Sequence, residues 1–147
     1  MGVQENKANA RRFLDEVMNR GNLDAVDELM GPRFVDHTAP PGVPEGAEGF
    51  KSFVTAFRAA VPDLQYTVED ELADGDTIVD RVRATGTMQG DFLGMPASGR
   101  SATWEEIHIT RYEDGRAAEH WGVVDQLGML VQLGFAQAPG QPAGVTG

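Results

Sequence analysis

The spacing of apolar residues changes at Pro62, and this change limits the folds that the chain can adopt. Before Pro62, apolar side chains recur at the three- and four-residue intervals of helices, in segments 6–20, 23–30 and 50–61. After it, they alternate as in half-buried strands, in segments 64–73, 77–88, 101–112 and 117–124. Helices followed by an antiparallel four-stranded meander predict an α+β fold, with the helices on one face of the sheet.

Shorter elements complete the predicted domain. Segment 33–38 is typical of a short strand, and residues 125–135 are typical of a short final helix. Asn22 is the predicted N-cap of the second helix. A chain of 147 residues suits one domain, which we expect to span residues 1–135, with a disordered tail at 136–147.

The acidic balance of the chain argues against nucleic acid and anionic membranes as partners. The formal net charge is −11, and the only adjacent basic residues are Arg11 and Arg12. No apolar run approaches the roughly 18 residues of a membrane span. The first residues show no secretory signal pattern, so we expect a cytoplasmic protein. The absence of cysteine excludes disulfides and thiolate chemistry.

Segment 101–112 has an unusually polar face. Trp104, Glu106, His108 and Thr110 alternate with a second set that contains Ile107 and Ile109. Two orientations fit this pattern: the isoleucines face the core and the histidine faces solvent, or the polar set faces an internal cavity.

The hairpin at 113–115 decides which residues of the next strand join that face. A two-residue turn at Asp114-Gly115 pairs His108 with Trp121, whereas a three-residue turn pairs His108 with His120. The sequence of the turn is compatible with both.

Further candidates for binding lie elsewhere in the chain. His37 is a candidate at the mouth of a cavity, although a turn or surface position is the alternative. Trp104 packs in the core or stacks on a planar ligand. Phe92 and Met95 belong to a long loop that forms an apolar lid or anchors itself to the core. No standard ligand spacing or phosphate loop is present, so we predict neither a metal nor a cofactor.

The order of elements and the run EEIHITRYEDGRAAEHWGVVDQLGMLVQLG resemble the SnoaL-like polyketide cyclases of the nuclear transport factor 2-like superfamily. The resemblance covers roughly residues 6–135. It implies a cone-shaped, cystatin-like fold, in which a curved antiparallel sheet packs against three N-terminal helices and encloses a pocket. It also favours the three-residue turn, which places Gly122 on the pocket side with His108 and His120.

In the aldol cyclases of that family, the histidine that matches His108 lines the pocket, and an aspartate on the next strand is the general acid and base. Gly122 occupies the matching position of that aspartate. We therefore expect proton transfer to rest on Glu106, His108 and His120. Asp125 is a further catalytic candidate, but an aspartate directly before a helix favours capping.

The predicted function is cofactor-independent acid–base catalysis by a cyclase, isomerase or lyase on a polyketide-like or other apolar carbonyl compound. An epoxide hydrolase-like enzyme and a non-catalytic ligand-binding or assembly domain are the alternatives, and Gly122 favours the last. The opposite sheet face mixes apolar and charged residues, and the resemblance implies dimers through the sheet. We therefore expect a homodimer or larger homo-oligomer.

Overall fold

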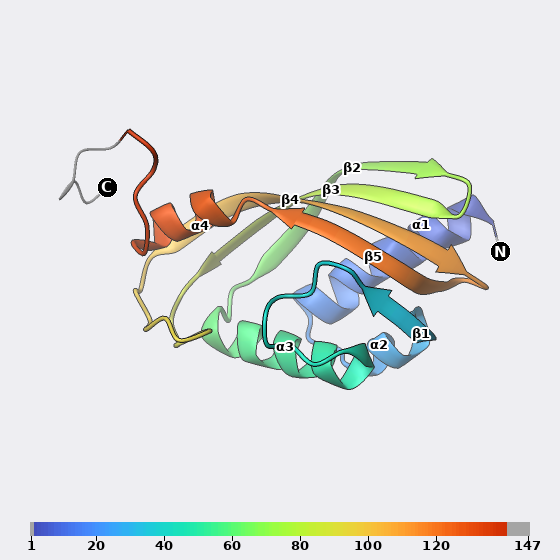
Figure 1. Cartoon of the computed structure of the whole chain (residues 1–147), viewed down its shortest axis with the longest axis horizontal. Coiled ribbons are helices and arrows are strands. Elements are labelled where there is room, and N and C mark those ends of the chain that lie inside the picture. The colour runs from blue at the N-terminus through green and yellow to red at the C-terminus, as the bar shows by residue number, and fades with distance from the viewer. Residues whose placement is uncertain (1, 141–147) are drawn as a thin grey trace.

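The computed structural model describes residues 2–140, in which a curved sheet arches over three helical segments (Figure 1). The four consecutive strands predicted from the alternating pattern all form and pair antiparallel in sequence order. They are β2 (Gln65–Asp74), β3 (Thr77–Thr87), β4 (Ser101–Glu113) and β5 (Arg116–Val124). The α+β prediction is thereby confirmed.

A fifth strand, β1 (Met30–Asp36), lies at the edge of the sheet beside β5. It is the short strand expected near residues 33–38, but it begins earlier and pairs in parallel, so the sheet order is β1-β5-β4-β3-β2. In this register Asp36 lies opposite His120. The parallel pair thus brings together residues that are far apart in the sequence.

The helices cover the concave face of the sheet, with the exception of α4, which lies at one end (Figure 1). The first amphipathic segment forms α1 (Val3–Arg12) and continues as a π-helix, η1 (Phe13–Asn19); the others are α2 (Asp24–Leu29), α3 (Gly46–Ala60) and α4 (Gln126–Leu133). The predicted cap at Asn22 is wrong. Leu23 occupies the N-cap position without a side-chain cap, because α2 begins one residue later than expected.

The core lies between the helices and the sheet. Val17 on η1, Val26 on α2, Val54 on α3 and Val82 on β3 are all 0% exposed. Each such side chain contributes roughly 1.5–3 kcal/mol by its burial. The concave face of the sheet is therefore fixed against three separate helical segments.

The β4–β5 hairpin differs from both predicted registers. Asp114 and Gly115 form a two-residue turn with φ of 52° and 77°, the left-handed conformation that such hairpins require. The register then shifts by one residue at Ala118, so His108 lies opposite Gly122 instead of Trp121 or His120. This bulge returns His120 and Gly122 to the face of His108. The expected three-residue turn is wrong, but the expected face is right.

No helix within residues 2–140 is long and apolar enough to span a membrane. Of the predicted tail, residues 136–140 form no helix or strand, and residues 141–147 lie outside the described part of the chain.

Candidate active site

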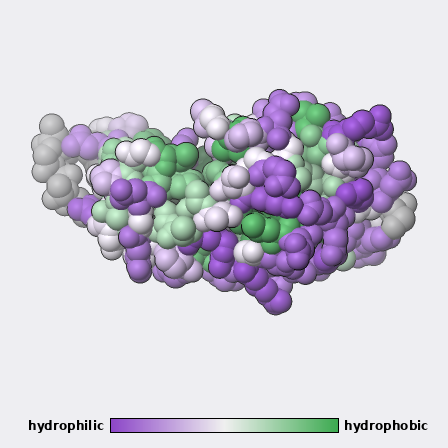
Figure 2. All heavy atoms as spheres, turned by 90° about the horizontal axis from the view of Figure 1, so that it is seen from below, coloured by the Kyte–Doolittle hydropathy of each residue, from purple (hydrophilic) through white to green (hydrophobic). Residues whose placement is uncertain are grey.

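A cavity of about 460 Å³ lies between the concave face of the sheet and the helices. Its apolar lining includes a group of phenylalanines from η1, α3 and the loop after β3, namely Phe13, Phe50, Phe53, Phe57 and Phe92. The Phe57 and Phe92 rings stack with centroids 5.1 Å apart. Apolar surface also gathers over this loop and the adjoining end of α3 in Figure 2. Such a lining favours a largely apolar ligand.

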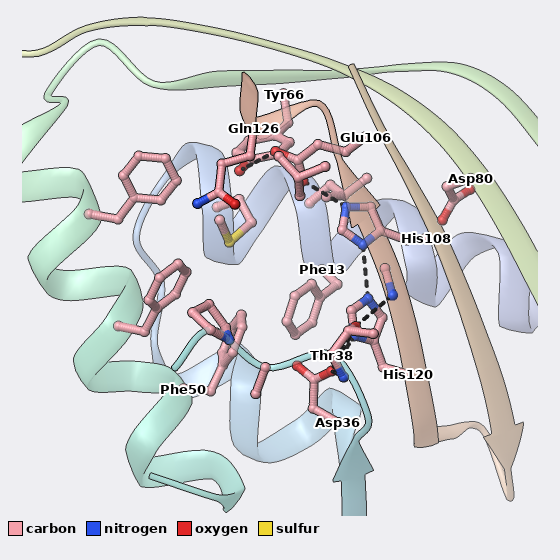
Figure 3. Close-up of a pocket in the computed structure, with 18 of the residues that line it drawn as sticks. Phe13, Asp36, Thr38, Phe50, Tyr66, Asp80, Glu106, His108, His120 and Gln126 are labelled. Atoms are coloured by element: carbon pink, nitrogen blue, oxygen red, sulfur yellow. Dashed lines mark hydrogen bonds and ion pairs between the residues drawn. The ribbon is translucent and has the colours of Figure 1, made fainter. Parts of the chain in front are cut away.

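The polar side of the cavity is a continuous row of four hydrogen-bonded side chains, here called the inner network (Figure 3). It joins Glu106 to His108, His108 to His120 and His120 to Asp36. The three bonds connect Glu106 Oε1 with His108 Nε2, His108 Nδ1 with His120 Nε2, and His120 Nδ1 with Asp36 Oδ1, each at 2.8 Å. The network therefore runs from β4 across β5 to β1.

Three hydrogen bonds of this kind need three protons. Two neutral imidazoles supply one N–H each, and these N–H groups donate to the carboxylates of Glu106 and Asp36. Lone pairs would then face each other on His108 Nδ1 and His120 Nε2. Their 2.8 Å separation requires a proton between them. The inner network therefore holds one proton more than two carboxylates and two neutral histidines.

The Glu106 end of the network is buried and held by two further donors. Trp104 Nε1 donates to Glu106 Oε2 over 2.7 Å, and the Tyr66 hydroxyl donates to the same oxygen over 3.2 Å. Burial and then the charge of Glu106 raise the pKa of Tyr66 well above its usual value, so its hydroxyl stays a donor. The Asn19 side chain fixes the Tyr66 backbone, donating to its carbonyl and accepting from its N–H.

The Asp36 end of the network lies nearer to solvent. Burial acts to raise the pKa of Asp36, but hydrogen bonds from His120 and Thr38 and the His120 charge outweigh it, so this pKa is lowered. Thr38 donates its backbone N–H to Asp36 Oδ1 over 3.0 Å. Asp36 is therefore a carboxylate near neutral pH, and it orients the His120 ring.

Gly122 provides the space that the two imidazoles occupy. A Cβ at this position would lie 2.9 Å from His108 Nδ1 and 3.1 Å from His120 Cε1. Contacts this short would force the rings apart. The Gly122 N–H instead donates to the Thr38 hydroxyl over 2.7 Å, which joins β5 to the segment after β1.

The structure brings most of the predicted site residues to one cavity. The polar face of β4 is turned inward, and the cavity is lined by Glu106, His108, His120, Trp104, Phe92 and Met95. Asp125 and His37 are not among the lining residues. Asp125 caps α4 by accepting from the Gly128 N–H over 3.0 Å. His37 is on the outer face, stacked on Trp121 with ring centroids 4.7 Å apart.

Asp36, Thr38, Tyr66 and Gln126 also line the cavity, and the sequence did not single them out. A signal was available for two of them. In an extended segment, Asp36 and Thr38 lie on the face opposite His37, so the prediction that His37 faces the cavity placed both of them on the outer face. Within residues 2–140 no group of three or more acidic, histidine or cysteine side chains could hold a metal ion.

Comparison with known proteins agrees with this architecture. The family model for SnoaL-like polyketide cyclases matches residues 8–133. The chain belongs to this family. It is 32% identical over 126 residues to the aklanonic acid methyl ester cyclase DnrD of Streptomyces peucetius, covering 84% of this chain and 87% of DnrD. It is 29% identical to the nogalonic acid methyl ester cyclase of Streptomyces nogalater, covering 79% of this chain and 88% of that cyclase.

Among solved structures, TsrD from Streptomyces laurentii superposes with a TM-score of 0.84 at 32% identity, covering 92% of this chain and 99% of TsrD. The fold is accordingly that of the nuclear transport factor 2-like polyketide cyclases. The curated relatives are cyclases, and the family membership identifies this chain as an enzyme of the polyketide cyclase type.

Proposed function

We propose that this protein closes a ring in a neutral polyketide ester by an intramolecular aldol reaction, with the inner network as its acid and base. The observation that carries the proposal is the 2.8 Å contact between His108 Nδ1 and His120 Nε2 on the wall of an apolar cavity. No cofactor is needed for this chemistry, because proton transfer to and from carbon and oxygen is its only requirement.

The charge of the cavity supports a neutral substrate. Within residues 2–140 no lysine or arginine lines the cavity, whereas Asp36 and Glu106 both do. These carboxylates would repel a free carboxylic acid in its ionised form. The names of the curated relatives specify methyl esters of aklanonic and nogalonic acids, in which this charge is absent. A methyl ester of a polycyclic aromatic polyketide therefore fits the cavity best.

The inner network can both remove a proton from the substrate and return it. When the shared proton leaves, one of the two facing nitrogens, His108 Nδ1 or His120 Nε2, becomes free to act as a base. That nitrogen takes a proton from the carbon next to a substrate carbonyl, and the resulting enolate forms the new carbon–carbon bond by attack on a second carbonyl carbon. The attacked oxygen becomes an alkoxide and takes the proton back, so the network returns to the form without the shared proton in which the reaction began.

The flanking residues keep the two histidines ready for this exchange. Glu106 and Asp36 each accept a hydrogen bond from one ring and thereby fix its tautomer and orientation. In the family resemblance, Gly122 occupies the position of the catalytic aspartate. We infer that the His108–His120 pair takes over the role of that aspartate and uses the room that glycine leaves.

Turnover of aklanonic acid methyl ester tests the proposal. The wild type should convert the ester to a cyclised isomer of equal mass, and His120→Gln should bind the ester but convert it far more slowly. The free acid should be converted at least about tenfold less efficiently, because it carries an uncompensated charge into the cavity. Unchanged conversion by both His120→Gln and His108→Gln would contradict the proposal. Binding without conversion by the wild type would favour the ligand-binding alternative.

We also propose that two copies associate through the outer face of the sheet. Ile107, Ile109, Trp121 and Val123 are exposed there, next to charged residues of both signs such as Glu105 and Arg111. An apolar surface with a mixed-charge border suits a twofold contact. Sedimentation should give a dimer mass that Val123→Asp shifts to the monomer. A monomer mass at all concentrations of the wild type would overturn the proposal.

A further inference from the structure

A second pair of acidic side chains lies under helix α1, beyond the inner network. Glu71 on β2 and Asp80 on β3 are register partners, and both point to the concave face. Their burial is nearly complete: Asp80 is 5% exposed and the Glu71 side chain 4%. Asp80 lines the cavity and is also the register partner of His108 on β4 (Figure 3).

The surroundings of this pair are poor in hydrogen-bond donors. Apart from the ion pair of Glu71 with Arg11 and the contact between the two carboxyls themselves, no donor in the described part of the chain reaches Asp80 Oδ1 or the Glu71 carboxylate, and Asn6 Oδ1 beside them is also buried without a partner. The cation that reaches the pair is Arg11 of α1, 2.9 Å from Glu71 Oε1, and its side chain is 63% exposed. Two ionised carboxylates cannot stay side by side in such a site. The pair therefore holds a proton.

We propose that the Asp80–Glu71 pair is a second proton-binding site of the cavity, and that the charge on Asp80 sets how tightly the His108–His120 pair holds its shared proton. This inference rests on the proposed function of the inner network. Asp80 is thereby a positioning residue, because it acts through His108 and not on the substrate.

The direction of the coupling follows from the charges around Asp80. Burial first, then the hydrogen bond and charge of Glu71, raise the pKa of Asp80 to about 7, although the charges of His108 and Arg11 oppose the rise. Tyr112 on β4 also faces the pair, and burial followed by the charges of Asp80 and Glu71 raises its pKa, so it stays neutral. When Asp80 loses its proton, its negative charge favours retention of the proton on the His108–His120 pair.

Two substitutions should shift the pH at which the His108–His120 pair loses its shared proton, and they should shift it in opposite directions. In Asp80→Asn the nearby negative charge is gone, so the shared proton should leave at a pH about one unit lower. In Glu71→Gln, the new amide donates to Asp80 and keeps it ionised, so the shared proton should leave at a higher pH. Asp74→Asn, an exposed carboxylate on the same strand as Glu71, is the matched control and should cause no shift.

The measurement is a pH titration of the ¹⁵N-labelled imidazoles by NMR, on the full-length protein without substrate. The proposal is supported if the midpoints of the histidine titrations shift in opposite directions in Asp80→Asn and Glu71→Gln. Unchanged midpoints, or shifts in the same direction, overturn it but do not contradict the proposed role of the inner network. If neither variant folds, the wild type alone decides: its Asp80 carboxyl signal and its His108 signals should titrate together, and independent titration overturns the proposal. A wild type without a shared proton would overturn the inner network as well.

Discussion

Two histidine–carboxylate contacts lie side by side where the end of β1 meets β5, and they differ in burial, in distance and in their further partners. His120 bonds Asp36 over 2.8 Å on the inner face, and His37 contacts Glu119 over 3.3 Å on the outer face. The inner contact continues through His108 to Glu106, whereas the outer contact faces solvent beside Arg111. The difference shows that burial and connection to further groups, not residue type, distinguish the contact to which we assign proton transfer from an ordinary surface contact.

The largest expected effect comes from breaking the inner contact. His120→Gln and Asp36→Asn should each lower kcat by about 10²–10⁴-fold, because the network loses a group that exchanges or orients its proton. KM should change little, since the apolar lining stays intact. The matched outer variant, His37→Gln, should leave kcat near that of the wild type. Steady-state kinetics of the three variants measure this difference. Equal losses of kcat in the inner variants and in His37→Gln would contradict the distinction between the inner and the outer contact.

The second-largest effect is expected at Gly122, which leaves room for the imidazole rings of His108 and His120. Gly122→Ala places a Cβ 2.9 Å from His108 Nδ1, so the two imidazoles must separate. We expect kcat to fall roughly 10–100-fold with the fold intact. Val123→Ala is the control, because Val123 is the next residue and points outward with 74% of its surface exposed. Retention of full activity by Gly122→Ala would show that the His108–His120 contact is not required.

A third effect separates two carboxyls of the inner face, Asp80 and Asp36, through the pH dependence of stability. The pKa of Asp80 in the folded protein is about 7, above its ordinary value of 3.8. Its contribution to stability is therefore complete below about pH 4 and is lost as the pH rises to about 7. The lowered pKa of Asp36 acts in reverse: its contribution is present above 3.8 and is lost as the pH falls further.

Urea denaturation between pH 3 and pH 8 measures these contributions. Asp80→Asn should flatten the decline in unfolding free energy between about pH 4 and pH 7. Asp36→Asn should instead reduce the loss of stability below about pH 4. If both variants follow the wild-type curve throughout, the buried carboxyls are not the groups that titrate.

The smallest effect is expected on the outer face itself. His37→Gln removes an exposed contact with Glu119 and should change Tm by no more than about 2 °C. Salt should weaken this contact, because exposed charges are screened. Differential scanning calorimetry at low and high ionic strength measures both. A larger decrease in Tm would show that the outer contact contributes more to stability than an exposed ion pair should.

The sequence predicted what depends on local alternation and missed what depends on pairing between distant strands. The inward polar face of β4 follows from its alternating pattern, and the capping role of Asp125 follows from its place before α4. Asp36 reaches the site only because β1 pairs in parallel with β5, which no local pattern encodes. The register of the hairpin depends on a bulge at Ala118, and neither turn length alone predicts it.

The same contrast applies to the histidines. The resemblance already placed His120 beside His108 on the cavity side, whereas the outward position of His37 and the contact of His120 with Asp36 became visible only in the tertiary structure. The resemblance to SnoaL-like cyclases identified the fold and the cavity. It did not identify how the space at Gly122 is used, because that use depends on the contact between two imidazoles across β4 and β5.

The exchange of substrate hydrogen for solvent deuterium tests the central claim most directly. With aklanonic acid methyl ester in D₂O, the inner network should remove and return the proton next to the carbonyl, so NMR should detect deuterium at that carbon in the presence of the wild type. His120→Gln should lose this exchange, whereas His37→Gln should keep it. Exchange by His120→Gln at the wild-type rate would contradict the assignment of proton transfer to the His108–His120 pair.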